Sequence, residues 1–429
     1  MKIIKNPPRT DWKAICKRPV LTAENLQELV NQIFEEVKVG GDKAIAKYTQ
    51  KFDKTSISTL AVSRAEIEKA ERELPNELKE AIQLAASTIT KFHKAQMPQK
   101  LEVETAPGVI CWQEARPIDK VGIYIPAGTA PLFSTVLMLA IPAKIAKCNQ
   151  VILCTPPDKN GNINPAILYA ANYVGVSKIY KVGGIQAIAG MTFGTESIPA
   201  VYKIFGPGNQ YVTAAKQRAS QLGVAIDMPA GPSELLVLAD DTANPAFVAS
   251  DLLSQAEHGA DSQVMCVVKS EKLISKIEEE VNSQLGKLPR KEIAEKAMEN
   301  SKFVLLEEDQ DCIDFINEYG PEHFIICCDN EDFYTKNIRN AGSVFIGNYT
   351  PESAGDYASG TNHTLPTNGY AKSFSGVNMD AFLKKVTFQK ISKSGIQNIG
   401  SAIEIMAEAE GLQAHKNAVT LRLNSLKND

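Results

Sequence analysis

Two polar side chains near the expected end of a helix are spaced for metal binding. Gln255 and His258 lie three residues apart, so both project from one helical face. An amide oxygen and an imidazole nitrogen on one face can serve as two ligands of one metal ion. The alternative is structural: a histidine near a helix C-terminus interacts favourably with the helix dipole in its charged form.

A second pair, Glu322-His323, directly precedes an apolar run that is typical of a strand. Neutral imidazole is a good proton acceptor near pH 7, so this pair predicts an acid/base function. Adjacent strand residues point to opposite faces, and we therefore expect no hydrogen bond between the two side chains. The alternative is a capping glutamate beside a histidine with a purely structural role.

The segment Gly355–Thr367 is polar, rich in hydroxyl groups and without helical or strand periodicity. Long ordered loops of this kind are often functional, although a solvated surface loop is the alternative. Asp356 within it could supply a carboxylate ligand. Glu410 and His415 lie five residues apart in a helical tail, where only a break at Gly411 would bring them together; without it they form an exposed helix.

Taken together, four of these side chains would give one metal ion a mixed shell of nitrogen and oxygen ligands. They are Gln255, His258, Asp356 and His415. Such a set suits Zn²⁺ better than Mg²⁺. The fifth histidine, His93, lies beside the apolar face of an expected helix, and we predict a solvated helix residue without a function.

Glycine-rich turns give a weaker signal for a nucleotide. Gly206-Pro207-Gly208-Asn209 precedes an expected helix but lacks the third small residue of the dinucleotide fingerprint. A glycine turn at a helix N-terminus can still receive a phosphate. Pro126-Ala127-Gly128 and Gly183-Gly184 are similar turns, so a dinucleotide could lie across these strand ends.

The elements that must position these residues alternate between strands and helices after a helical N-terminal third. Apolar runs predict a first series of strands at 120–126, 150–154, 178–182 and 203–205, and a second series at 234–239, 263–269, 302–306, 323–328 and 343–346. Helical patterns separate most of them, which predicts parallel sheets and an α/β fold with two domains. The mostly helical tail after Gly376 is too small for its own core and should pack on another surface.

Composition excludes several classes of protein. The 429 residues carry 46 Lys and Arg against 50 Asp and Glu, a net charge of −4, without a long charge run, which argues against nucleic acid or an anionic membrane as the main partner. The apolar run Val136–Ile141 is stopped by Pro142, far short of a membrane span. Eight cysteines without a CxxC pair indicate reduced thiols, and with no secretion signal at the start we expect a cytoplasmic protein.

Several longer motifs, in this order along the chain, resemble the histidinol dehydrogenase family. They are Tyr124-Ile125-Pro126, Phe205-Gly206-Pro207-Gly208-Asn209, Ile226–Ser233, Ser254–Gly259, Pro321-Glu322-His323, Gly355–His363 and Glu410–His415. The resemblance runs from about Thr22 into the tail. It implies a zinc-dependent enzyme that oxidises L-histidinol through L-histidinaldehyde to L-histidine, the last steps of histidine biosynthesis, with two NAD⁺.

The resemblance also implies a role for individual residues. Gln255, His258, Asp356 and His415 would be zinc ligands that also contact the substrate, and Glu322 and His323 the acid/base pair, His323 contacting substrate as well. Ser233, His363 and Glu410 would be further substrate contacts, and Tyr124, Gln186 and Asn209 would contact NAD.

The same resemblance implies two Rossmann-like parallel-sheet domains in an intertwined homodimer. The expected parts are an N-terminal segment (1–21), a metal-binding catalytic domain (22–123 with 234–375), an NAD-binding domain (124–233) and a helical tail (376–429) that completes the partner's site.

Three rival functions remain distinguishable. Cys111 or Cys148 could form a thiohemiacetal, although neither has an adjacent activating base in the sequence. A zinc hydrolase would not reduce NAD⁺. A non-catalytic ligand-binding protein of this fold would tolerate loss of Glu322 and His323.

Overall fold

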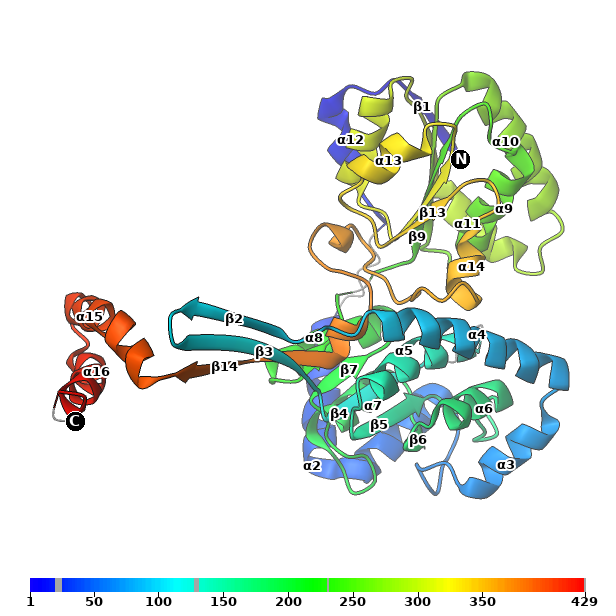
Figure 1. Ribbon diagram of the computed structural model, residues 1–429. Coiled ribbons are helices and arrows are strands. Elements are labelled where there is room, and N and C mark those ends of the chain that lie inside the picture. Colours follow the sequence, from blue (N-terminus) through cyan, green and yellow to red (C-terminus); the bar gives the residue numbers. More distant parts are fainter. Residues whose placement is uncertain (20–24, 127–130, 230, 428–429) are drawn as a thin grey trace.

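Two parallel sheets form the centres of two lobes, as the alternation of strands and helices predicted (Figure 1). The computed structural model describes residues 1–19, 25–126, 131–229 and 231–427. The first sheet has the order β6-β5-β4-β7-β8, and the second has the order β1-β11-β10-β9-β12-β13. Every pair of neighbouring strands in both sheets is parallel.

The strands lie close to their predicted positions. Those of the first sheet are β4 (Lys120–Tyr124), β5 (Gln150–Thr155), β6 (Lys178–Lys181), β7 (Lys203–Phe205) and β8 (Ala225–Ile226). Those of the second are β1 (Lys2–Lys5), β9 (Glu234–Ala239), β10 (Gln263–Val268), β11 (Lys302–Leu305), β12 (His323–Cys327) and β13 (Ser343–Ile346). All residues of β9, β10 and β12 are buried, because helices cover both faces of the sheet.

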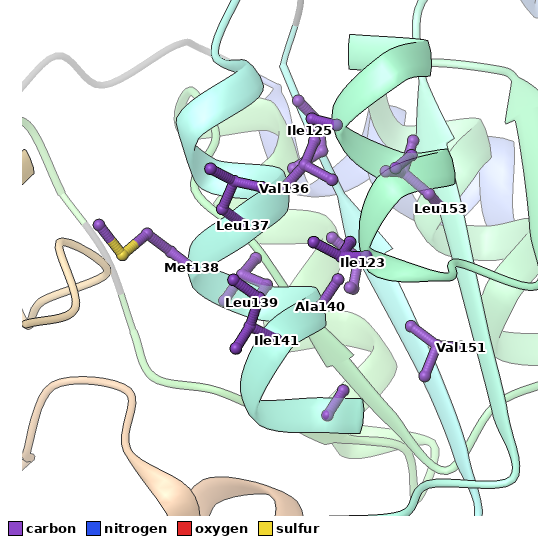
Figure 2. Close-up of a cluster of buried hydrophobic side chains, with 14 of the residues drawn as sticks. Ile123, Ile125, Val136, Leu137, Met138, Leu139, Ala140, Ile141, Val151 and Leu153 are labelled. Atoms are coloured by element: carbon purple, nitrogen blue, oxygen red, sulfur yellow. The ribbon is translucent and has the colours of Figure 1, made fainter. Parts of the chain in front are cut away.

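Helices cover both faces of the first sheet. One group consists of α2 (Leu26–Asp53), α7 (Gly184–Phe193) and α8 (Gln210–Gln221), and the other of α3 (Arg64–Glu73), α4 (Asn76–Ala95), α5 (Phe133–Ile145) and α6 (Pro165–Val174). Helix α5 is apolar all round and packs between the sheet and α4. Figure 2 shows its side chains beside Ile123, Val151 and Leu153 of the sheet.

The second lobe follows the same plan. Helices α9 (Pro245–Ala256), α10 (Glu271–Leu285) and α11 (Lys291–Glu299) share one hydrophobic cluster with the sheet, while α1 (Trp12–Ile15), α12 (Asp309–Tyr319) and α13 (Glu331–Asn337) share another. The short helix α14 (Glu352–Tyr357) follows β13 and leads into the polar loop that the sequence singled out. Single 3₁₀ turns lie at Arg9–Asp11, Tyr370–Lys372 and Met379–Phe382.

The expected grouping of residues into domains differs from the structure at the N-terminus. Residues 22–123 were expected to join 234–375, but α2 packs on α7 and α8, and α4 packs on α5. The reason is that their apolar faces complete the two cores of the first sheet. The N-terminal segment instead supplies β1, which pairs with β11 of the second sheet.

Two local features shape the N-terminal helices. Ser63 and Glu66 form a capping box at the start of α3. Gly41 adopts φ +52° and kinks α2, which continues to Asp53.

An extended arm leaves the first lobe and carries the C-terminus (Figure 1). It consists of the antiparallel strands β2 (Leu101–Ala106), β3 (Val109–Pro117) and β14 (Leu383–Ile391), followed by α15 (Lys393–Ala409) and α16 (Gln413–Ser425). The tail is mostly helical, as expected, and it also contains the strand β14. Strand β14 is largely exposed, with Val386 and Phe388 partly buried, and it pairs with all of β3.

Within the described residues, no helix is both long and apolar enough to cross a membrane. The predicted turn at Pro126-Ala127-Gly128 lies outside them after Pro126.

Candidate active site

The acid/base candidates lie at the amino end of β12, which lies between β9 and the edge strand β13 in the second sheet. His323 is the first residue of β12 and pairs in register with Leu235 of β9 and Ser343 of β13. Glu322 precedes it, and both side chains are buried. Helix α9 runs back from the carboxyl end of β9, so its C-terminus, with Gln255 and His258, returns to this same edge of the sheet.

One ring nitrogen of His323 has a hydrogen-bond partner among the described residues, and the other has none. Nδ1 lies 3.3 Å from the carbonyl oxygen of Glu234, an atom that can only accept, so Nδ1 carries the proton in the neutral ring. Nε2 is buried without a hydrogen-bond partner among the described residues and lies 3.8 Å from Asp356 Oδ1. Burial lowers the pKa of His323 to about 4, which leaves Nε2 unprotonated near pH 7.

The side chain of Glu322 is held by a hydrogen bond to the neighbouring strand β9. Its Oε2 accepts a hydrogen bond of 2.9 Å from the backbone nitrogen of Glu234 and lies 3.8 Å from His323 Nδ1, too far for a bond. The two side chains thus do not hydrogen-bond, as their adjacency on a strand predicted. Burial raises the pKa of Glu322 well above its ordinary value.

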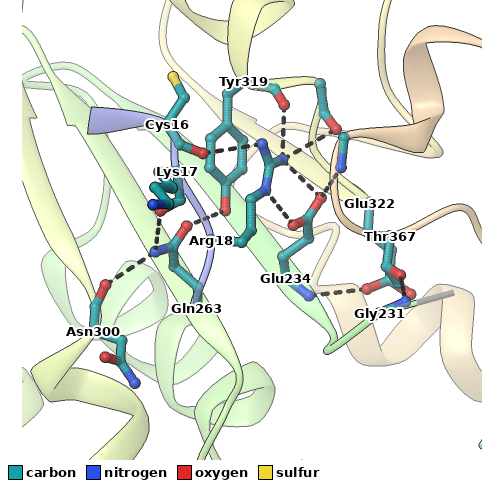
Figure 3. Close-up of polar contacts among 12 residues, drawn as sticks. Cys16, Lys17, Arg18, Gly231, Glu234, Gln263, Asn300, Tyr319, Glu322 and Thr367 are labelled. Atoms are coloured by element: carbon teal, nitrogen blue, oxygen red, sulfur yellow. Dashed lines mark hydrogen bonds and ion pairs between the residues drawn. The ribbon is translucent and has the colours of Figure 1, made fainter. Parts of the chain in front are cut away.

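A buried ion pair fixes the start of β9 (Figure 3). Glu234 accepts hydrogen bonds from Arg18 Nε at 2.6 Å and Arg18 Nη2 at 2.8 Å. The Arg18 guanidinium lies over the ring of Tyr319, 3.7 Å from its centroid. The N-terminal segment therefore holds the strand whose backbone contacts both Glu322 and His323.

Three side chains come together as a possible metal site. His258, Glu352 and Asp356 each offer one ligand atom, and these atoms lie within 4.8 Å of one another. Gln255 is fully buried, and neither its amide oxygen nor its nitrogen has a partner in the described part of the chain. Unpaired buried polar atoms are costly, so this arrangement fits a site that accepts a further group.

Glu352 is the residue of this cluster that the sequence reasoning missed. Its Oε1 lies 3.6 Å from His323 Nδ1, and its Oε2 accepts a hydrogen bond of 3.3 Å from Ser254 Oγ. Burial, together with the charges of Asp356 and Glu322, raises its pKa well above the ordinary value. A signal existed in the sequence, because Glu352 and Asp356 are four residues apart after Pro351 and so share one helical face.

His363 reaches this cluster from the polar loop and contacts both lobes. Its Nδ1 donates to the carbonyl oxygen of Asp356 at 2.9 Å, so its Nε2 accepts from Thr135 Oγ1 of α5 at 3.0 Å. Ser233, Glu322 and His363 line one small cavity of about 70 Å³ together with Gly206-Pro207-Gly208 of the first lobe.

His93 is fully buried, which corrects the prediction that it is solvated. Its Nδ1 donates to the carbonyl oxygen of Ile89 at 2.8 Å, and its Nε2 lies 3.3 Å from Asn362 Nδ2. Asn362 Nδ2 also donates to Met138 O. His93 therefore supports the loop residue next to His363, a long-range contact that helical periodicity does not reveal.

The other two predicted site residues lie elsewhere in this single chain. Glu410 directly follows α15 and His415 lies in α16, and both are exposed. These two helices lie at the end of the arm, away from the lobes (Figure 1). The helix break that they require is present, since α15 ends at Ala409 and Gly411 adopts φ +74° before α16.

A cleft of about 560 Å³ lies at the carboxyl edge of the first sheet. Tyr124, Gln186 and Asn209 line it with Gly184 and Pro126. Tyr124 Oη accepts a hydrogen bond of 3.1 Å from Gly184 N, and Asn209 Oδ1 caps α8 through the backbone nitrogens of Tyr211 and Val212. The carboxyl edge of a parallel sheet is the usual place for a nucleotide.

The cysteines offer no activated thiol in the described residues. All eight are free. Cys111 lies on β3 in the arm, and burial raises the pKa of Cys148 to about 11. Both are thus unsuited to nucleophilic catalysis.

Comparisons with known proteins agree over the whole chain. A family model described as histidinol dehydrogenase matches residues 16–423. A histidinol dehydrogenase from Bacteroides fragilis is 60% identical over 427 residues, 100% of each chain, and one from Escherichia coli K12 is 51% identical, covering 97% of this chain and 95% of that one. A crystal structure of the enzyme from Elizabethkingia anophelis has a TM-score of 0.98 at 59% identity, covering 100% of this chain and 99% of that one.

Proposed function

The chain belongs to the histidinol dehydrogenase family, an NAD-dependent oxidoreductase that oxidises histidinol to histidine, and from this premise we propose which of its residues carry the reaction. The observation that carries the proposal is the free Nε2 of His323, buried on a ring whose other nitrogen faces a carbonyl oxygen. A positioned, unprotonated nitrogen is what the removal of an alcohol proton requires.

The residues present fit the zinc ion on which the family depends. We propose that Gln255, His258 and Asp356 hold it, because Gln255 has unpaired buried amide atoms and the other two lie in one cluster of ligand atoms. This is a mixed nitrogen and oxygen set, as zinc accepts. When bound, zinc supplies a fixed positive charge that orients nitrogen and oxygen atoms of the substrate.

The residues of this chain then account for the proton movements. Each of the two oxidations removes a hydride, which passes to one NAD⁺, and a proton. We assign the proton of the substrate hydroxyl to His323 Nε2. Between the two oxidations water must add to the aldehyde, and we assign the removal of a proton from that water to Glu322.

The substrate would be held at the amino edge of the second sheet, and the dinucleotide at the carboxyl edge of the first sheet. The small cavity shared by Ser233 and His363 borders Gly206-Pro207-Gly208, which leads to Asn209 in the larger cleft. We propose that Ser233 and His363 bind histidinol, and that Tyr124, Gln186 and Asn209 bind NAD in the cleft. The nicotinamide end would then face the cavity and His323.

The exposed arm supports a homodimer in which each tail completes the partner's site. Its apolar side chains are unusually exposed, among them Leu101 (60%), Ile405 (65%), Met406 (65%) and Leu421 (62%). Exposed apolar surface of this extent marks an interface. We propose that Glu410 and His415 of the partner subunit enter the site, His415 as the fourth zinc ligand and Glu410 as a substrate contact.

Free thiols are typical of a reducing compartment, and we propose that the enzyme works in the cytoplasm.

The test of this assignment is the stoichiometry of NAD⁺ reduction. We expect two NAD⁺ reduced per L-histidinol, followed by absorbance at 340 nm, and loss of activity to a chelator. His323→Ala should retain zinc but lose both oxidations. Cys111→Ala and Cys148→Ala are the matched controls, and inactivity of either folded, zinc-loaded variant would contradict the assignment of the proton transfer to His323.

A further inference from the structure

The dinucleotide cleft contains a carboxylate that no part of the reaction uses. Asp53 is the last residue of α2 and lines the cleft with Tyr124 and Gln186. Its Oδ2 is buried and has no hydrogen-bond partner in the described part of the chain. A buried acceptor without a donor costs free energy, so a ligand that brings a donor would repay that cost.

The second acidic residue at the cleft, Asp158, already accepts hydrogen bonds from its own loop. Asp158 follows β5, the strand end at which a dinucleotide-binding fold usually places its ribose-binding acid. Here Asp158 is exposed, and its Oδ1 accepts hydrogen bonds from the backbone nitrogens of Asn160 at 2.8 Å and Asn162 at 2.9 Å. It therefore stabilises its own loop, and Asp53 is the acid left free to bind a ligand.

Strand order tells which end of the dinucleotide lies near Asp53. β7 leads into Gly206-Pro207-Gly208, which borders the cavity of Glu322 and His363, and β5 lies on the other side of β4. The loop after β5 lines the cleft together with Phe52 and Asp53. With the nicotinamide toward the cavity, the adenosine end lies toward β5 and Asp53.

We propose that Asp53 accepts a hydrogen bond from the adenosine ribose of the bound dinucleotide and thereby selects NAD over NADP. The inference rests on the proposed NAD cleft. NAD offers a vicinal diol with two donors at this ribose, whereas NADP carries a phosphate on its 2′ oxygen. The carboxylate and the negative end of the α2 dipole both repel that phosphate.

Neighbouring charges agree with this assignment. Burial raises the pKa of Asp53 to about 6, so the side chain is a carboxylate at pH 8. Burial, together with the charge of Asp53, raises the pKa of Tyr124 to about 12, and both residues line the cleft. Lys159 is the single cation among the described residues that line the cleft, and it is exposed.

The test measures binding without catalysis. Affinities of zinc-loaded protein for ADP-ribose and for 2′-phospho-ADP-ribose are determined by calorimetry at pH 8. Wild type should prefer ADP-ribose by about tenfold or more, and Asp53→Asn should reduce this preference at least about fivefold, since one charged hydrogen bond is lost. The ratio of kcat/KM for NAD⁺ and NADP⁺ should change in the same direction.

Matched variants separate the possible outcomes. Asp53→Ser removes the charge with a different shape, and the exposed Asp241→Asn is a control that should leave the preference unchanged. A change of preference in Asp158→Asn instead of Asp53→Asn, or an unchanged preference in both folded Asp53 variants, would overturn the proposal.

A further variant separates this proposal from the assignment of the cleft. Gln186→Ala should weaken both ligands to a similar extent. If Gln186→Ala weakens ADP-ribose and Asp53→Asn leaves the preference intact, the cleft stands and only the role of Asp53 fails. If Gln186→Ala leaves the affinity for ADP-ribose unchanged, the assignment of the cleft itself is wrong, and with it the role of Asp53.

Discussion

Glu352 shares its buried surroundings with Glu322, Asp356 and Asp251, whose charges, together with burial, raise its pKa. Such a concentration of carboxylates opposes folding unless a cation is bound. It is therefore a feature that costs stability and makes sense at a site built to hold a metal ion.

We predict that Glu352→Gln separates stability from function. Replacing one ionisable group of this crowded cluster by a neutral amide should leave the melting temperature of the zinc-free protein unchanged or higher. Because the side chain lies beside His258, Asp356 and His323, zinc affinity or kcat/KM should fall by about 10- to 100-fold. Ser254→Ala keeps the Glu352 carboxyl group but removes the hydroxyl that contacts Glu352 Oε2 and Asp251 O, and it is the matched control. A zinc-free Glu352→Gln protein that melts well below wild type would contradict this account.

His93 gives a prediction for the pH dependence of stability. Burial lowers its pKa, while its hydrogen bond to Ile89 O opposes the shift. The unfolded chain, with a histidine pKa near 6.5, then binds the proton more readily than the folded one. The contribution of His93 is complete above about pH 6.5 and is lost as the pH falls toward its lowered folded value, by at most about 1.4 kcal/mol per pH unit.

The measurement is the melting temperature of wild type and His93→Gln between pH 8 and pH 5. Glutamine does not titrate in this range, so the variant should start lower at pH 8 and lose less on acidification. Parallel curves for the two proteins would show that His93 does not carry this pH dependence.

The site residues differ in how far the sequence could reveal them. Gln255, His258, Asp356, Glu322 and His323 belong to motifs with local spacing, and the structure brings the last four of them together. Thr135 and His93 act through contacts with residues 228 and 269 positions away, so no local pattern indicates their roles.

At the scale of elements, the turn after β7 depends on one close approach of two strands. Gly206 adopts φ +129°, and a Cβ there would lie 2.0 Å from Tyr124 O on β4. Two side chains stabilise the turn further. Lys216 Nζ donates to Gly206 O at 2.9 Å and forms an ion pair with Asp227. Asp227 Oδ2 in turn accepts a hydrogen bond of 2.8 Å from Gly206 N. The turn can therefore hold Asn209 in a fixed place.

We predict that Gly206→Ala destabilises the first lobe and weakens NAD binding. Gly223 supplies the control, since it also has a positive φ, +93°, but no atom lies within 4 Å of its Cβ position. Gly223→Ala should cost only backbone strain, about 1–3 kcal/mol. Gly206→Ala should cost clearly more, measured by denaturant unfolding, and should raise KM for NAD⁺. Equal costs for the two variants would show that the close approach to β4 is unimportant.

The elements themselves were predictable where periodicity was strong. The strands of both sheets, apart from the short β1 and β8, and the helices between them follow from apolar runs and glycine turns. The hairpin β2–β3 and strand β14 were missed, because they form a half-exposed sheet whose pattern resembles that of a polar segment. Their pairing is also non-local, since Leu383 pairs with Pro117.

In the whole molecule, the amino edge of the second sheet faces the carboxyl edge of the first sheet. The proposed metal site lies at the amino edge of the second sheet, and the proposed dinucleotide cleft lies at the carboxyl edge of the first. Thr135 and His363 join them through a 3.0 Å hydrogen bond. The arm leaves this assembly with exposed apolar side chains, and none of its contacts among the described residues brings His415 to the cluster within one chain. Composition and length could not reveal that the arm extends away from the lobes, because they carry no information on which segments contact one another.

Mixed dimers test whether the tail serves the partner. His323→Ala and His415→Ala should each be inactive alone, the first for lack of a base and the second for lack of a zinc ligand. If tails are exchanged, one site of a mixed dimer carries both changes and the other carries neither. Random mixing of equal amounts gives half mixed dimers with one intact site in two, so activity should recover to about a quarter of wild type. Mixed dimers are verified with two affinity tags, and recovery should require refolding or co-expression. If verified mixed dimers stay inactive, His415 does not act on the partner's site.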